Sequence, residues 1–173
     1  MSNRILLVED DEELIDFIAD DLTETYHVVK AFNGREALDR LQEEAIQLVV
    51  SDVMMDVMDG FELCKIIKAS FEYCHIPVIL LTAKNSLQSK IEGLELGADA
   101  YIEKPFAQEY LQVQIANLLA NRDKIKGFYA KSPLVHIKSI AHSKSDEFFL
   151  EKLNEVIYNN LSDENLDVDK LAN

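Results

Sequence analysis

Side chains able to do chemistry follow four short apolar runs of this 173-residue sequence. Glu9 and Asp10 come directly after the first run, and Asp52 comes after a later one. Three carboxylates held together repel by roughly 4 kcal/mol per close pair at an effective dielectric of about 20, so they require raised pKa values or a cation. Their oxygen atoms suit a hard divalent ion, preferably Mg²⁺ that keeps some of its waters.

A hydroxyl group and a positive charge complete the predicted cluster. Thr82 follows the third of these runs, and Lys104, beside Pro105, follows the fourth. Carboxylates, a cation, a lysine and a hydroxyl together suit a phosphoryl group, whose transfer depends on positioning and charge neutralisation. The residue types therefore predict phosphoryl chemistry.

The elements that must position these side chains alternate along the first 125 or so residues. Five strands alternating with five helices predict an α/β fold, a doubly wound parallel sheet with right-handed crossovers and helices on both faces. Ligands of such sheets bind at the carboxyl ends of the strands, where these side chains would converge. The predicted strands cover residues 5–8, 26–31, 46–50, 77–81 and 100–102. Five helices are predicted between and after these strands. The first carries Leu14 to Leu22, the second begins after an N-cap at Asn33 with Glu36 as its capping-box partner, and the third follows Gly60. The fourth carries Ile91 to Glu95, and the fifth runs from Tyr110 toward Lys126.

Composition excludes several classes of protein. With 32 acidic and 17 basic residues the formal net charge is −15, which argues against a surface built for nucleic acid or anionic lipid. No apolar run approaches the roughly 18–20 residues of a membrane span. Cys64 and Cys74 form neither a disulfide framework nor a zinc motif, so we expect a cytoplasmic location.

Five motifs follow one another in the first part of the sequence. They are Leu7-Val8-Glu9-Asp10-Asp11, Ser51-Asp52-Val53-Met54-Met55 through Met58-Asp59-Gly60, Leu81-Thr82-Ala83, Gly97-Ala98-Asp99-Ala100-Tyr101 and Lys104-Pro105-Phe106. In this order they resemble the receiver domain of two-component response regulators, over about residues 3–125. The resemblance implies a flavodoxin-like fold, with five parallel strands in the order 2-1-3-4-5 and five helices.

The resemblance also implies a role for each acidic residue. Asp52 would be the nucleophile that takes a phosphoryl group from a phosphohistidine and forms an aspartyl phosphate. Glu9, Asp10 and Asp52 would bind Mg²⁺, with the backbone carbonyl of Met54 as a further ligand. Many receivers carry proline four residues after the phosphoacceptor, where this chain has Asp56, so the stiffness of that loop is in question.

The remaining site residues would bind the phosphoryl group and report its presence. The resemblance implies that Thr82 and Lys104 bind phosphoryl oxygens and that Tyr101 is the aromatic whose rotamer follows Thr82. The domain would then be a conformational switch rather than a turnover enzyme, and phosphorylation would alter dimerisation or release an attached domain. A histidine kinase, in cis or in trans, would be the phosphodonor, and a homodimer is a further expectation.

The C-terminal segment carries a second resemblance. We expect a receiver over residues 3–126, a linker over 127–144, and over 145–173 the incomplete start of an AraC-type helix-turn-helix domain, as in hybrid sensor kinase/response regulators. Only the first helix and the start of the second would be present, so this piece would not bind DNA specifically and would not contact a membrane. The motifs that carry this resemblance are Asp146 to Leu153, Val156-Ile157, Asn160-Leu161 and Leu166 to Ala172.

Three alternatives stand beside these expectations. A Mg²⁺-dependent phosphatase would also place an aspartate after a strand, but it would normally have a second aspartate where Met54 stands. A structural pseudo-receiver would keep the fold without the chemistry, which the complete set of site residues argues against. The C-terminal helix could also be a plain amphipathic helix for dimerisation or docking.

Overall fold

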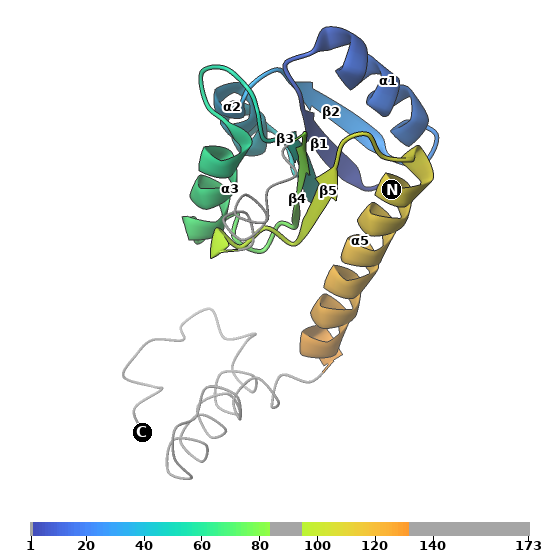
Figure 1. Ribbon diagram of the computed structural model, residues 1–173. Helices are drawn as coiled ribbons and strands as arrows, with labels where there is room; N and C mark the ends of the chain where they lie inside the picture. The colour runs from blue at the N-terminus through green and yellow to red at the C-terminus, as the bar shows by residue number, and fades with distance from the viewer. Residues whose placement is uncertain (1, 84–94, 132–173) are drawn as a thin grey trace, which may run out of the picture. The chain divides into compact units, whose positions relative to one another are not determined.

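A parallel five-stranded sheet is the centre of the structure. The computed structural model describes residues 2–83 and 95–131 of a chain that divides into two compact units, Met1–Asn121 and Arg122–Asn173. In the first unit the strand order is β2-β1-β3-β4-β5 and every neighbouring pair is parallel, which confirms the predicted topology (Figure 1). The elements are β1 (Arg4–Val8), α1 (Glu12–Leu22), β2 (His27–Ala31), α2 (Gly34–Glu43), β3 (Leu48–Asp52), α3 (Gly60–Ala69), β4 (Val78–Thr82), β5 (Ala100–Glu103) and α5 (Gln108–Lys131).

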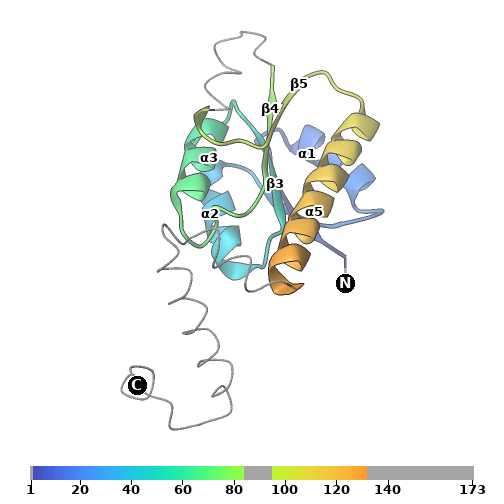
Figure 2. The ribbon, with the colours of Figure 1, turned by 90° about the horizontal axis from the view of Figure 1, so that it is seen from below.

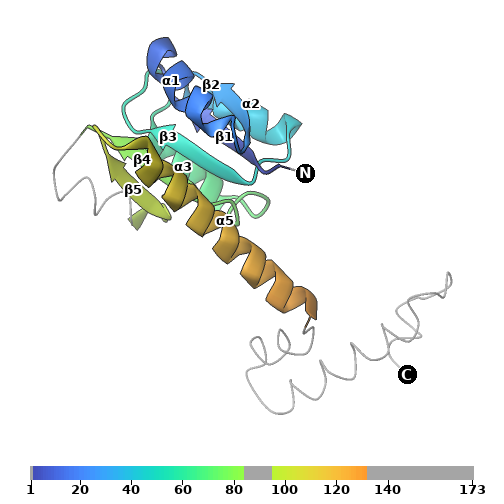
Figure 3. The same ribbon diagram turned by 90° about the vertical axis from the view of Figure 1, so that its right-hand side faces the viewer.

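Helices cover both faces of the sheet. Seen from below, α2 and α3 lie on one side of the strands, while α1 and α5 lie on the other (Figure 2). The same arrangement can be followed from the side in Figure 3. Because both faces are covered, every residue of β3 and β4 is buried, as expected for the inner strands of a parallel sheet.

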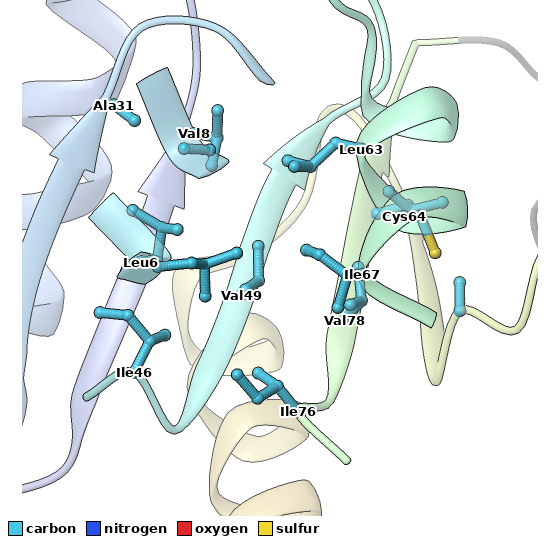
Figure 4. Close-up of a cluster of buried hydrophobic side chains, with 14 of the residues drawn as sticks. Leu6, Val8, Ala31, Ile46, Val49, Leu63, Cys64, Ile67, Ile76 and Val78 are labelled. Atoms are coloured by element: carbon cyan, nitrogen blue, oxygen red, sulfur yellow. The ribbon is translucent and has the colours of Figure 1, made fainter. Parts of the chain in front are cut away.

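Side chains alternate between two apolar clusters, one on each face. Leu6 and Val8 of β1 point to the face covered by α2 and α3, where Leu63, Cys64 and Ile67 of α3 meet them (Figure 4). On the opposite face the residues of β1 at odd positions pack with helices α1 and α5. This alternation with a period of two is the geometry of a β-strand. Both apolar clusters lie on the faces of the sheet, and the polar groups described below lie at the carboxyl ends of the strands. The second cluster includes Ile5, Leu7, Ile15, Ile18, Val50, Leu81, Leu111 and Ile115.

The predicted cap of α2 is present, with one difference in its partner. The Oδ1 atom of Asn33 accepts a hydrogen bond from the backbone N–H of Glu36 at 2.9 Å, which confirms Asn33 as the N-cap. The carboxylate of Glu36 accepts from the N–H of Phe32, also at 2.9 Å, one residue before the position expected for a capping box.

The predicted third strand begins two residues too early. The strand that forms is Leu48–Asp52, while Ile46 is buried in the core before the strand begins. An apolar run reports burial, whereas a strand begins where its backbone pairs with its neighbours. The strand also ends two residues later than predicted, so Asp52 is its last residue and pairs with Leu81 of β4.

The last helix is longer than expected. Helix α5 continues to Lys131, past Lys126 and into the segment expected to be the linker. Gly127 stands within it, and apart from its neighbours in the helix no atom of the described residues lies within 4 Å of the position that a Cβ would take. Glycine in an exposed helix costs only about 1 kcal/mol, so the helix can continue through it. The helix predicted around Ile91 and the helices predicted over 145–173 lie outside the described residues.

None of the helices in residues 2–83 and 95–131 combines the length and the apolar character that crossing a membrane requires.

Candidate functional site

The acidic residues after β1 have two structural roles, one in capping α1 and one in the site. Asp11 is the N-cap of α1, and its Oδ1 accepts from the backbone N–H groups of Glu13 and Leu14 at 3.0 Å each. The carboxylates in the first turn of this helix favour its dipole. Glu9 and Asp10 precede the cap and point to the site instead, Glu9 with 2% of its surface exposed and Asp10 exposed.

Asp52 lies at the carboxyl end of the central strand, with 5% of its surface exposed. Its Oδ2 accepts from the backbone N–H of Met54 at 3.1 Å, so the chain that follows the strand folds back to hold the carboxylate. The N–H of Val53 donates to the carbonyl of Leu81 at 2.8 Å, which continues the pairing with β4 just beyond Asp52.

The predicted carboxylate cluster is assembled. Glu9, Asp10 and Asp52 each offer an oxygen atom, and these atoms all lie within 4.8 Å of one another. Strand order brings them together, because β1 and β3 are neighbours and end at the same edge of the sheet. A set of hard oxygen donors around a partly exposed mouth fits a divalent cation that keeps some waters.

Lys104, the residue directly after β5, joins this cluster. Its Nζ lies 2.7 Å from Oε2 of Glu9 and 2.8 Å from Oδ1 of Asp52. The backbone N–H of Lys104 donates to the carbonyl of Thr82 at 2.7 Å, which anchors the start of the loop, and the following peptide bond to Pro105 is cis. Burial lowers the pKa of Lys104, but the hydrogen bonds and charges of Asp52 and Glu9 outweigh burial and leave this pKa raised.

Glu9 is the carboxyl group whose protonation the site shifts most clearly. Burial is the main reason that its pKa is raised, and the negative charge of Asp52 acts in the same direction. The hydrogen bond and charge of Lys104 oppose this rise without cancelling it. A second positive charge placed among these oxygens would favour the ionised form of Glu9.

Thr82 and Tyr101 lie on the neighbouring strands β4 and β5. Thr82 is fully buried and ends β4, one residue after the partner of Asp52 in the sheet. Tyr101 pairs with Leu80 and packs partly against the apolar cluster under α3. Its hydroxyl is buried and has no hydrogen-bond partner in the described part of the chain.

Met54 contacts the carboxylate of Asp52 through its backbone N–H. Its N–H binds the Asp52 carboxylate, and its side chain is exposed; the expected role of its carbonyl as a metal ligand stays a prediction. One residue that sequence reasoning missed is Gly60, because a Cβ built on it would collide with the backbone carbonyl oxygen of Asp52. The signal was available in Asp59-Gly60, a cap and glycine pair that lets α3 begin directly against the strand end.

Comparison with known proteins gives a consistent result. The family described as the response regulator receiver domain matches residues 5–116. The chain is 40% identical over 166 residues to histidine kinase P4 of Formosa agariphila, and 40% identical over 116 residues to the uncharacterized transcriptional regulatory protein YrkP of Bacillus subtilis. The signal receiver domain of a signal transduction histidine kinase from Syntrophus aciditrophicus superposes with a TM-score of 0.66 at 36% identity, covering 69% of this chain and 92% of that one.

The chain spans only a part of these curated relatives. The alignments cover 96% and 66% of this chain but 12% of histidine kinase P4 and 48% of YrkP. The likeness to the first therefore extends beyond the residues matched by the receiver family, into the C-terminal segment.

Proposed function

This chain belongs to the response regulator receiver domains of two-component signalling, and from that premise we propose that Asp52 accepts a phosphoryl group from a phosphohistidine. The observation that carries the proposal is the convergence of Glu9, Asp10, Asp52 and Lys104 at one edge of the sheet. A receiver domain implies a histidine kinase as its partner, and the proposal holds for a donor supplied in cis or in trans.

Asp52 is held as a nucleophile. Lys104 contacts one of its carboxylate oxygens and the Met54 N–H contacts the other, so the group loses little further freedom on reaching the phosphorus. In the proposed step a carboxylate oxygen forms the new O–P bond while the N–P bond of the phosphohistidine breaks. The electron pair of that bond returns to the imidazole nitrogen, which takes up a proton. Lys104 and Thr82 would bind oxygens of the transferred group.

Magnesium is the cation that we propose for the carboxylate cluster. Glu9, Asp10 and Asp52, with the carbonyl of Met54, would hold it, and it would supply neutralisation of the phosphoryl charge. The carboxylate oxygens of Glu9, Asp10 and Asp52, all within 4.8 Å of one another, support this cation site.

Tyr101 is proposed to report the modification. Its buried hydroxyl, unpartnered within the described residues, supports a side chain whose position is not fixed by a hydrogen bond. Phosphorylation would draw Thr82 toward the phosphoryl group, Tyr101 would follow, and the surface of β5 and α5 would change. This makes the domain a phosphoacceptor switch.

The phosphatase alternative is less well supported. Such an enzyme needs an acid or base close to the phosphoaspartate, and the second position after Asp52 is occupied by Met54, whose side chain carries no titratable group and is exposed.

The direct test is modification of the chain by a small phosphodonor such as phosphoramidate in the presence of Mg²⁺, followed by intact mass and peptide mapping. We expect one phosphoryl group on the wild type, none on Asp52→Asn, and one on Asp56→Asn, the matched control in the same loop. An unmodified wild type, or a modified Asp52→Asn variant, would overturn the proposal. Omission of Mg²⁺ should slow the reaction strongly, and an unchanged rate would exclude the proposed cation site.

For the whole protein we propose a hybrid regulator whose receiver domain lies in the cytoplasm, either as a cytoplasmic protein or as the cytoplasmic part of a membrane-anchored one. The match to histidine kinase P4 over 96% of this chain supports a sensor kinase on the same polypeptide. The motifs after residue 145 support an AraC-type DNA-binding output, joined through a linker over 127–144, and phosphorylation would alter homodimerisation or release this output domain. The coding sequence should then continue past Asn173 with two helix-turn-helix units, and a stop codon at that point would refute this architecture.

A further inference from the structure

The loop between β3 and α3 holds an unusual turn at its tip. The N–H of Met58 donates to the carbonyl of Asp56 at 2.8 Å, and Val57 between them has a φ of 69°. A β-branched residue in this left-handed region is strained, because its Cβ approaches the backbone too closely. Such a conformation persists only where the surroundings hold it in place.

The group that holds this tip belongs to α2. The N–H of Gly34 donates to the carbonyl of Met58 at 3.2 Å, and within residues 2–83 and 95–131 it is the one backbone hydrogen bond that reaches the tip from another element. A Cβ on Gly34 would lie 2.6 Å from Cγ and 2.8 Å from Sδ of Met58. A methyl group added at position 34 would therefore force the Met58 side chain out of its present position.

Gly34 is itself firmly held. It is the first residue of α2, directly after the N-cap Asn33, whose side chain is bonded to the first turn. Ala37, one turn along the same helix, is buried in the core cluster beneath it. The start of α2 is thus a fixed point against which the loop can rest.

A displacement of the loop would be felt at the carboxylate. The N–H of Gly60 donates to the carbonyl of Val53 at 3.1 Å, at the other end of the same loop. Between these anchors the N–H of Met54 binds Oδ2 of Asp52. Because the loop is short and fixed at both ends, its tip cannot move far without changing the position of Met54.

We propose that Gly34 and Met58 form a strut that positions the loop after Asp52, and with it the carboxylate, for phosphoryl transfer. Both are positioning residues, and the inference rests on the proposed role of Asp52. The strut provides the stiffness that a proline at position 56 would otherwise give, so Asp56 is compatible with a rigid loop.

The test is a double-mutant cycle on the 173-residue chain. In Gly34→Ala the rate of modification by phosphoramidate should fall about tenfold and the Kd for Mg²⁺ should rise several-fold, because the new methyl group pushes Met58 away. Met58→Ala alone should slow the reaction about twofold. The double variant should recover to within about threefold of the wild type, because the shortened side chain makes room for the methyl group.

Leu41→Ala is the control for loss of stability. It opens a cavity under the same helix without touching the loop, so the chain should unfold at lower urea while the rate of modification stays at the wild-type value. The strut is refuted if Gly34→Ala reacts at the wild-type rate, if the double variant is no faster than Gly34→Ala, or if Leu41→Ala slows the reaction equally.

A second variant keeps the test decisive if Gly34→Ala does not fold. Asn33→Ala weakens the hold on Gly34 without adding a clash, so it should slow modification about twofold to threefold, and an unchanged rate would overturn the strut. A wild type that is not modified at all would refute the proposed role of Asp52 instead. In that case the coupling of Gly34→Ala and Met58→Ala in urea unfolding and in Mg²⁺ titration still tests the contact.

Discussion

Replacing Lys104 by methionine should expose how much the site depends on cations. The amino group of Lys104 lies between two buried carboxylates, 2.7 Å from Glu9 and 2.8 Å from Asp52, and 19% of its side chain is exposed. Lys104→Met keeps a side chain of similar length and removes the charge. The two carboxylates are then left close together without their partner.

The magnitude follows from these distances. At 2.7 Å and an effective dielectric of about 20, the attraction between Lys104 and Glu9 is about 6 kcal/mol before desolvation is subtracted. Removing one partner of a buried pair costs about 3–5 kcal/mol in practice. Because the cluster opens to solvent at Asp10, we expect the lower end, a loss of about 3 kcal/mol in the free energy of unfolding without Mg²⁺.

Magnesium should reverse part of this loss. In the variant the same oxygen atoms carry charge that no lysine neutralises, so the Kd for Mg²⁺ should fall about tenfold, which adds about 1.4 kcal/mol of stabilisation at saturating Mg²⁺ compared with the wild type. The measurement is urea unfolding followed by circular dichroism, with EDTA and with saturating Mg²⁺.

Lys68→Met is the matched control. Lys68 forms an ion pair with Asp99 at 2.7 Å at the opposite edge of the sheet, with the side chains 17% and 34% exposed. Its loss should cost about 1–2 kcal/mol, by the same amount with and without Mg²⁺. If Lys104→Met is destabilised no more than Lys68→Met, or if Mg²⁺ stabilises both equally, the electrostatic reasoning about the site is wrong.

Four further tests address other features of the described residues. Gly60→Ala should lower the free energy of unfolding by about 2 kcal/mol and slow phosphorylation, since its methyl group would meet backbone atoms. Gly127→Ala, whose methyl group enters open space, should leave the free energy of unfolding unchanged or raise it by up to about 1 kcal/mol. Urea unfolding measures both, and a larger loss in Gly127→Ala than in Gly60→Ala would contradict this reasoning. Val57→Gly should raise the free energy of unfolding by about 0.5–1 kcal/mol, because the backbone strain removed with the left-handed valine exceeds the entropy that glycine adds to the unfolded chain. A lower free energy of unfolding in the urea assay would contradict this. Iodoacetamide should label the exposed Cys74 and spare the buried Cys64 until urea is added, as peptide mapping would show. Burial raises the pKa of Cys64 from 9.0 to about 11. Between pH 9 and 11 the thiol therefore ionises in the unfolded chain but not in the folded one, and the free energy of unfolding should fall over this range more steeply than in Cys64→Ala.

The cluster of site residues could be predicted because it depends on topology alone. Glu9, Asp52, Thr82 and Lys104 each follow or end an apolar run, and parallel strands end at one edge whatever their register. The alternation of runs and helical periods was enough to predict the sheet. The start of β3 was wrong by two residues because burial of Ile46 and backbone pairing are different properties.

The contacts that fix the site could not be predicted from the pattern. That Lys104 bridges Glu9 and Asp52, rather than only one of them, depends on distances set by the packing of β5 against β4. The meeting of Gly34 with Met58 joins segments that no periodicity links. Asn33-Gly34 could be recognised as a helix start, but the loop resting on it is a tertiary feature.

The two glycines that follow N-cap residues, Gly34 and Gly60, also affect the chemical degradation of the chain. Asn-Gly and Asp-Gly pairs rearrange through a succinimide when the glycine nitrogen attacks the preceding side chain. In Asn33-Gly34 and Asp59-Gly60 the side chain is bonded to its own helix and the glycine N–H is donated to a carbonyl of the loop. Both reactants are thus kept apart in the folded chain, and damage should accumulate only as fast as the loop opens. Peptide mapping after storage with and without urea would measure this difference, which sets the chemical lifetime of the loop beside Asp52.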